Sequence, residues 1–213
     1  MPQPRLESVP IPATIDDRPL PPPVRLQIHA ARCRIERFQD RWDRPQPEQF
    51  VAADYELVYR ALEWWRETRR PGGNRFLEWG CGFAVVTAMA ASLGFDAIGI
   101  EAEGELLAYG RQTLSDWDQP AELIRGDFLP RGAETLADDP TLPSLGHDLP
   151  CGYETLGLEL DDFSLVYGYP WPGEETFHQE VFRRHAAPGA ELLQFCGPHD
   201  LRLWRKVLGG DGR

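Results

Sequence analysis

The stretch that decides the fold is Phe76-Leu77-Glu78-Trp79-Gly80-Cys81-Gly82-Phe83-Ala84. Its first four residues are mostly apolar and predict a short buried strand, and residues 83–93 have the length and composition of a helix. A glycine-rich turn between a strand and a helix lets a ligand approach the backbone closely. It also aims the free amide groups of the helix start at that ligand. The stretch therefore predicts a ligand-binding turn in an α/β fold.

Short apolar strands alternate with helices outward from this turn. Strands are expected at 76–79, 97–100, 122–124, 163–167 and 191–195, and helices at 83–93, 103–115, 174–186 and 199–208. This rhythm is typical of a doubly wound α/β fold, in which helices cover both faces of a mostly parallel sheet. Residues 129–160 are rich in Pro, Gly and Asp, and are expected to form a long irregular insertion.

The N-terminal third has a different composition. Residues 1–23 hold eight of the 20 prolines and are expected to form a flexible, Pro-rich arm. Residues 24–29 alternate apolar and polar side chains, which predicts a strand. Helices expected at 30–43 and 51–68 complete an N-terminal strand and helical cap over 24–74. Residues 75–213 form the main domain.

The charge of the chain narrows the classes of partner. The formal net charge is −12, and residues 76–213 carry 23 acidic against nine basic side chains. An acidic body repels a phosphate backbone, so this composition argues against nucleic acid as a partner. No apolar run approaches the roughly 20 residues that a membrane helix needs, and no signal peptide is apparent. Four scattered cysteines form no CxxC pair for a metal. We expect a cytoplasmic protein without a metal site and without membrane contact.

One helix face could still bind an anion. Arginines at three- and four-residue spacing mark the helix expected at 30–43, namely Arg34, Arg37, Arg41 and Arg44. The simpler interpretation is a solvated face paired with neighbouring acids of the same helix. The alternative is a docking strip for an anionic partner such as RNA.

The turn itself matches a more specific pattern than a strand followed by glycines. A dinucleotide fingerprint would require a small residue at position 85, which is Val85. The pattern acidic-x-Gly-x-Gly-x-Gly/Ala is instead matched by Glu78, Gly80, Gly82 and Ala84. The segment resembles motif I of the class I S-adenosylmethionine (SAM)-dependent methyltransferases. The resemblance implies a Rossmann-like sheet of order 3-2-1-4-5 and SAM as cofactor.

The same resemblance implies a role for each strand end. Glu78 would lie near the methionine portion of SAM, and the turn Gly80-Cys81-Gly82 would lie against the cofactor. Glu101, at the end of the second strand, would accept both ribose hydroxyls. Asp127 and Phe128, after the third strand, would bind the adenine. These residues stand in family order at the carboxyl ends of strands, where ligands bind in such folds.

The loop after the fourth strand should face the methyl acceptor. Residues 168–175 contain Tyr169-Pro170-Trp171 but no Asn or Asp, so the motif of enzymes that methylate base amines is missing. Tyr169 and Glu174 are the candidate catalytic residues. Glu175 and His178 are further candidate bases, although acids at a helix start are also favoured by its dipole. Trp171 is a candidate aromatic wall for the substrate, or simply packs under the insertion.

The helix before the turn contributes a further candidate. Residues 50–56 stand where protein-lysine methyltransferases without a SET domain carry a Phe-Val-Pro-Thr-like stretch, which borders the methionine end of SAM. The prolines are missing here, so only the position carries over, with Tyr55 as a substrate-side lid residue or a core residue.

The C-terminal part is expected to be shortened. The family sheet ends in an antiparallel pair after the fifth strand, and residues 199–208 read as a helix instead. The exposed edge of the fifth strand would then be covered by 24–29 or by a partner chain, as in a dimer through that edge. The function we expect is methyl transfer from SAM to a small molecule or a protein side chain. A non-catalytic SAM-binding regulatory or scaffold protein and an RNA methyltransferase are the alternatives.

Overall fold

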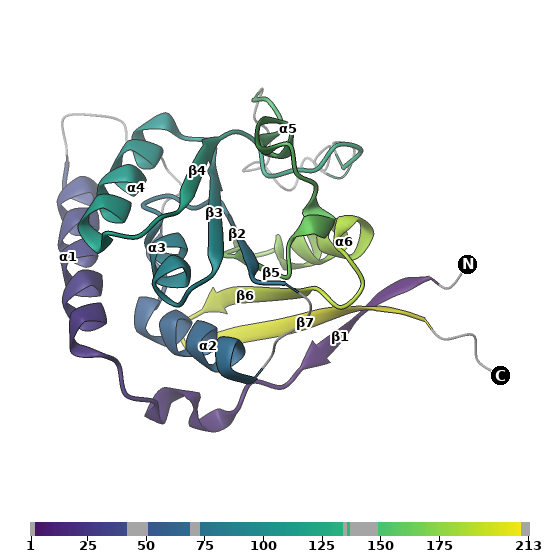
Figure 1. Cartoon of the computed structure of the whole chain (residues 1–213), viewed down its shortest axis with the longest axis horizontal. Helices are drawn as coiled ribbons and strands as arrows, with labels where there is room; N and C mark the ends of the chain where they lie inside the picture. Colours follow the sequence, from purple (N-terminus) through teal and green to yellow (C-terminus); the bar gives the residue numbers. More distant parts are fainter. Residues whose placement is uncertain (1–2, 42–50, 69–72, 134–135, 137–148, 210–213) are drawn as a thin grey trace.

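The computed structural model describes residues 3–41, 51–68, 73–133, 136 and 149–209. Its centre is one seven-stranded sheet of order β1-β7-β6-β5-β2-β3-β4 (Figure 1). The strands are β1 (Pro4–Val9), β2 (Arg75–Trp79), β3 (Asp96–Glu101), β4 (Glu122–Arg125), β5 (Leu165–Gly168), β6 (Glu191–Gly197) and β7 (Asp200–Leu208). Strands β2 to β6 are mutually parallel, and β7 runs antiparallel to both β6 and β1.

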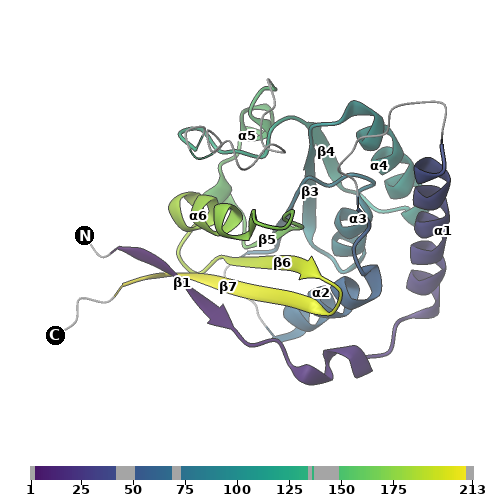
Figure 2. The ribbon, with the colours of Figure 1, turned by 180° about the vertical axis from the view of Figure 1, so that it is seen from behind.

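Helices cover both faces of this sheet (Figures 1 and 2). One face packs against α1 (Pro22–Gln39), α2 (Tyr55–Thr68), α3 (Val85–Ser92) and α4 (Gly104–Trp117) through a large apolar core. The other face packs against α5 (Gly152–Leu156) and α6 (Glu175–His185) through a second core. The doubly wound α/β class is confirmed, and the order predicted for the five parallel strands is found as β4-β3-β2-β5-β6.

The predicted C-terminal helix is wrong. Residues Asp200–Leu208 form strand β7, which pairs with β6 from Glu191↔Arg205 to Gly197↔Asp200. The physical reason is the unpaired edge that β6 would otherwise present to solvent. Because β7 covers this edge, the sheet is not shortened there, and the argument for a dimer through the edge of β6 no longer holds.

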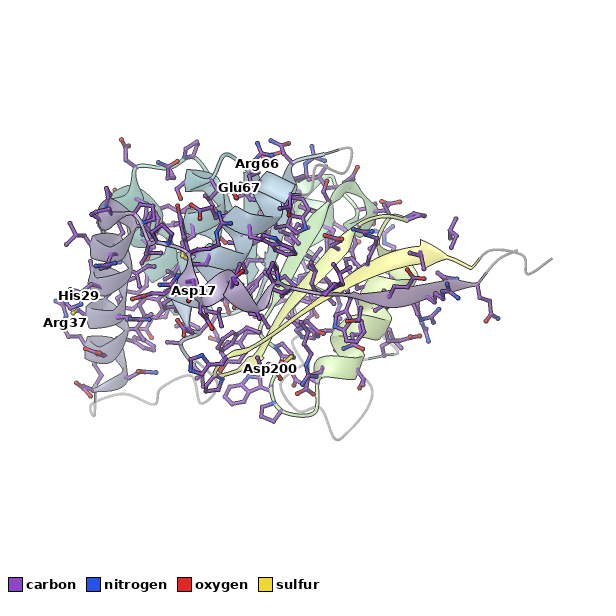
Figure 3. All side chains as sticks on the ribbon, turned by 90° about the horizontal axis from the view of Figure 1, so that it is seen from below. Asp17, His29, Arg37, Arg66, Glu67 and Asp200 are labelled. Atoms are coloured by element: carbon purple, nitrogen blue, oxygen red, sulfur yellow. The ribbon has the colours of Figure 1, made fainter. Side chains whose placement is uncertain are left out.

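The predicted N-terminal arm and strand are also wrong. Within the arm, Pro4–Val9 form β1, which lies along β7 from Pro4↔Leu208 to Val9↔Leu203. A 3-10 turn follows at Ala13–Asp17, and Arg18 then pairs with two acids of α2, Glu63 and Glu67 (Glu67 is labelled in Figure 3). The N-terminal segment is therefore anchored at both the sheet and α2.

Residues 24–29 are helical because α1 begins inside the proline run. Proline is well tolerated in the first helical turn, where its missing N–H would have no partner. The apolar residues then follow helical spacing and are buried, as Val24, Ile28, Ala31, Ile35 and Phe38. The helix predicted at 30–43 thus starts eight residues earlier, and the residues of its far end beyond 41 lie outside the described part of the chain.

Arg34 of α1 and Arg41, two residues after its end, hold this helix to α4. Arg34 pairs with Asp116 of α4 and donates to the Thr113 hydroxyl, and Arg41 pairs with Glu105. Arg37 instead points outward (Figure 3), while Arg44 lies outside the described residues. Two of the arginines therefore form ion pairs, as expected. The acids that they pair with belong to α4 and not to the same helix.

Candidate cofactor site at the carboxyl ends of the strands

The glycine-rich turn has the open backbone that its sequence predicts. Gly80, Gly82 and Ala84 all have left-handed backbone angles, with φ of 63°, 52° and 53°. Nothing lies within 4 Å of where a side chain at Gly80 would start, so the space in front of it is free. Cys81 between them is buried, and its amide donates to the Ile100 carbonyl at 2.9 Å. The turn therefore offers exposed backbone on one side and is fixed to β3 on the other.

Glu101 joins the second strand end to this turn. Its carboxylate accepts hydrogen bonds from the Gly82 amide at 2.7 Å and from the Glu103 amide at 2.8 Å. The side chain is buried, and burial raises its pKa. A carboxylate has about four acceptor positions, so two amide bonds leave Glu101 able to accept further hydrogen bonds.

Glu78 faces the start of α3. One carboxylate oxygen accepts from both the amide and the hydroxyl of Thr87 in the first turn of that helix. Burial raises the pKa of Glu78 to about 8, and the nearby Glu101 carboxylate contributes in the same direction. Within the described part of the chain, no ion pair joins Glu78 to a basic residue. Glu78 is therefore a buried acid that favours its neutral form.

Tyrosines gather beside Glu78. Tyr167 stands opposite Glu78 in the register of β2 and β5, so both side chains lie on the same face of the sheet. Tyr55, at the start of α2, interacts electrostatically with both Glu78 and Tyr167, and Tyr169, just after β5, interacts with Tyr55 and Tyr167. We call Tyr55, Glu78, Tyr167 and Tyr169 the tyrosine–carboxyl group. Tyr55 and Tyr169 were candidates from the sequence, whereas Tyr167 was not.

Asp127 and Phe128 follow β4, as predicted. One Asp127 carboxylate oxygen accepts from the Leu129 amide at 2.9 Å, and the Asp127 backbone bridges to Cys151. The Phe128 ring stacks on Trp79 with ring centres 5.3 Å apart and meets His178 edge-on. Asp127 thus holds a tight turn, and the Phe128 ring packs toward the end of β2.

The candidate catalytic loop is held in place by Glu174. Its carboxylate accepts from the Trp171 amide at 3.2 Å, and its own amide donates to the Trp171 carbonyl at 2.8 Å. Glu174 is buried and burial raises its pKa, while Trp171 is half-buried. Tyr169 packs edge-on against Phe195 at 4.8 Å. The loop therefore brings Glu174 to Trp171, whereas Tyr169 is held separately against β6.

His178, a candidate base from the sequence, lies in an apolar environment. It is buried against Trp79, Phe128 and Phe177, with Nδ1 lacking any hydrogen-bond partner among the described residues. Burial lowers its pKa to about 3. Sequence reasoning missed this environment because the faces of α6 that reach the sheet depend on tertiary packing.

The chain is similar to known proteins in its three-dimensional structure but not in its sequence. No family model matches the chain, and no curated protein matches its sequence. The 16S rRNA N2 G1207 methyltransferase of Thermus thermophilus, solved with AdoMet and guanosine, aligns with a TM-score of 0.50 at 14% identity. That alignment covers 76% of this chain and 44% of the other.

Two further structures align over more of their own length. An RNA methyltransferase from Salinibacter ruber, solved with S-adenosyl-L-homocysteine, has a TM-score of 0.43 at 12% identity, over 92% of this chain and 97% of its own. A hypothetical protein from T. thermophilus has a TM-score of 0.47 at 18% identity, over 78% of this chain and 89% of its own.

These findings correct one expectation. The acidic composition argued against nucleic acid as a partner, and that prediction is wrong, because the rRNA methyltransferase shares this fold.

No helix in the described residues is long and apolar enough to cross a membrane. The cofactor expected from the sequence agrees with the AdoMet bound in the rRNA methyltransferase. The chain has the Rossmann-like fold of the class I SAM-dependent methyltransferases.

Proposed function

We propose that this chain is a SAM-dependent methyltransferase whose cofactor lies across the ends of β2, β3 and β4. The observation that carries the proposal is the hydrogen bond from the Gly82 amide to the Glu101 carboxylate. It joins the open turn in front of Gly80 to a buried acid at the next strand end. A bare backbone beside a fixed carboxylate suits a ligand with vicinal hydroxyls, such as a ribose.

In this proposal each strand-end residue has a part in binding. Glu101 accepts the ribose hydroxyls, and Gly80, Cys81 and Gly82 lie along the cofactor. Glu78 faces its cationic methionine end, while Asp127 and Phe128 contact the adenine. SAM supplies a methyl group on a positively charged sulfur, which an in-line nucleophile can displace. The protein then mainly has to align that nucleophile.

The acceptor side is assigned to the loop after β5 and to α2. Trp171 and Tyr55 contact the acceptor, and Tyr169 and Glu174 orient it, with Glu174 as the base where the nucleophile carries a proton. Burial raises the pKa of Glu174, and this direction supports that role, because a carboxylate with a raised pKa is a stronger base. A small molecule or a protein side chain is the acceptor we propose.

The first test is binding of SAM by isothermal titration calorimetry to the wild-type chain and Glu101→Gln. Loss of hydrogen bonds to a charged acceptor should weaken binding by about 10- to 100-fold. The matched control is Glu122→Gln, which removes a carboxylate at the exposed, opposite end of β4. Thermal unfolding without ligand separates an effect on binding from an effect on folding.

Unchanged affinity in Glu101→Gln would refute the pocket assignment. Transfer of labelled methyl groups to small molecules, peptides and RNA then tests the acceptor. RNA belongs in this panel because the similar T. thermophilus enzyme acts on rRNA. Binding of SAM without transfer to any acceptor would favour the non-catalytic alternative.

A further inference from the structure

Tyr167 carries a buried hydroxyl without a hydrogen-bond partner. Its side chain is 2% exposed, and the hydroxyl is one of two such side-chain atoms in the described residues. Leaving a buried polar group unpaired is costly, and such groups in folded proteins are rare. The hydroxyl therefore calls for a group that the chain itself does not provide.

The position of Tyr167 points to a ligand. Tyr167 lies near the end of β5 beside Glu78 of β2, and sheet order reverses between these two strands. Ligands of open α/β sheets bind outside the strand ends at this switch point. The free face of Gly80 begins two residues beyond Glu78 on the same strand end.

The surroundings of the hydroxyl select the charge of that ligand. The groups that act on Tyr167 are the Glu78 carboxyl, the hydroxyls of Tyr55 and Tyr169, and the Cys196 thiol. None of these groups is basic, and Glu78 can release its proton to pair with a cation, so they favour a cationic ligand. Burial raises the pKa of Tyr167 well above its ordinary value. The phenol therefore keeps its proton, and its oxygen can accept a hydrogen bond from a cationic donor.

We propose that the Tyr167 hydroxyl binds the ammonium group at the amino-acid end of SAM, next to Glu78. This inference rests on the proposed function and adds a binding residue that the sequence pattern did not indicate. Tyr167 is a binding residue and not a base, since it holds its proton throughout.

The second unpaired atom, His178 Nδ1, lies in different surroundings. The His178 ring is enclosed by Trp79, Phe128 and Phe177 on the α6 face of the sheet. None of these ring contacts is an acid that could pair with an ammonium group, so this atom suits the same ligand end less well than Tyr167 does. The two atoms therefore need separate explanations, and only Tyr167 faces the acid.

The test compares three ligands on the wild-type chain and Tyr167→Phe by calorimetry. SAM and S-adenosyl-L-homocysteine both carry the amino-acid end, whereas 5′-methylthioadenosine lacks it. Tyr167→Phe should weaken SAM and S-adenosyl-L-homocysteine by about tenfold or more, since the hydrogen bond is to a charged group. The affinity for 5′-methylthioadenosine should stay within about twofold.

Stability provides a second readout. Removing an unpaired hydroxyl should leave the melting temperature without ligand unchanged or raise it. Tyr153→Phe is the control, because the equally buried Tyr153 hydroxyl accepts from Trp79 Nε1 at 2.8 Å. That variant should lower the melting temperature, because the hydrogen bond is lost and the Trp79 donor is left without its partner.

Three results would overturn the proposal. Unchanged binding of all three ligands by Tyr167→Phe would show that the hydroxyl meets no cofactor group. An equal loss for all three would show general damage to the pocket. A wild-type chain that binds none of them would refute the proposed function as well, and is thereby distinguished from the first two results.

Discussion

The two faces of the sheet differ in what surrounds two consecutive residues of β5, Tyr167 and Gly168. Tyr167, with its unpaired hydroxyl, lies on the face covered by α2 and α3, on the same side of the sheet as the Glu78 carboxyl, which acts on it electrostatically. Gly168 faces α6, where the unpaired Nδ1 of His178 lies over it. Both atoms are cut off from water, but one neighbourhood contains an acid and the other contains aromatic rings.

This difference should give the two faces opposite pH dependence. Burial raises the pKa of Glu78 from 4.5 to about 8, so the folded chain holds a proton that the unfolded chain has lost. Burial lowers the pKa of His178 from 6.5 to about 3, so the folded chain lacks a proton that the unfolded chain has gained. Raising the pH from about 4.5 to about 8 therefore lowers the free energy of unfolding through Glu78. Lowering the pH from about 6.5 towards 3 lowers it through His178.

The largest expected effect is that of Glu78→Gln on the pH profile of stability. In the wild-type chain, Glu78 should lower the free energy of unfolding by about 1.4 kcal/mol per pH unit as pH rises from about 4.5 to about 8. The variant should lose this slope. Urea denaturation at several pH values measures it, with the exposed acid in Glu7→Gln as a control for the lost charge. Parallel profiles of Glu78→Gln and wild type would contradict the prediction.

The next effect is that of His178→Phe on the acid side. In the wild-type chain, His178 should lower the free energy of unfolding by about 1.4 kcal/mol per pH unit as the pH falls from about 6.5 towards 3. Between 4.5 and 6.5 this slope opposes that of Glu78, so each variant reveals the contribution of the other residue. His178→Phe should therefore unfold at lower pH than wild type. His178→Asn, which keeps a polar atom, should shift acid unfolding in the same direction, and no shift in either would refute the assignment.

Much of the fold could be predicted around the turn because its signals are local. The strand at 75–79, the glycines with left-handed backbone and the helix after them are specified within about 20 residues. The turn and Glu101 were both placed at the carboxyl ends of parallel strands, which lie at one edge of the sheet, and the structure joins them there through the Gly82 amide. The cofactor roles of these residues are still proposals, because the fold alone does not test them.

The ends of the chain could not be predicted in the same way. Val24 and Ile28 fit both an alternating strand and a helix, and only packing on α2, α3 and α4 decides between them. Strand β1 pairs with β7 across almost the whole chain, from Pro4 to Leu208, so no local pattern shows the partner. An edge that lacks a partner in the sequence can therefore be covered from the other terminus.

The environments of Tyr167 and His178 depended on tertiary contacts for the same reason. An alternating strand pattern places Tyr167 on one face of the sheet. That Glu78 stands opposite it is known only once β2 and β5 are found to be adjacent. For His178, helical spacing alone does not show that the side chain is buried. Its burial follows from the close approach of α6 to Gly168, which the sequence does not encode as a motif.

The smallest expected effect is that of Gly168→Ala, which tests this close approach. A side-chain carbon at Gly168 would lie 2.7 Å from His178 Nδ1, nearer than packing allows. The cost of such overpacking is typically about 1–3 kcal/mol, and we expect about 2 kcal/mol from urea denaturation at neutral pH. A double-mutant cycle with His178→Ala assigns the cause, because the smaller side chain removes the clash and should recover most of the loss. If Gly168→Ala is equally destabilising with and without His178, the cost does not come from the approach of α6 to Gly168 at His178.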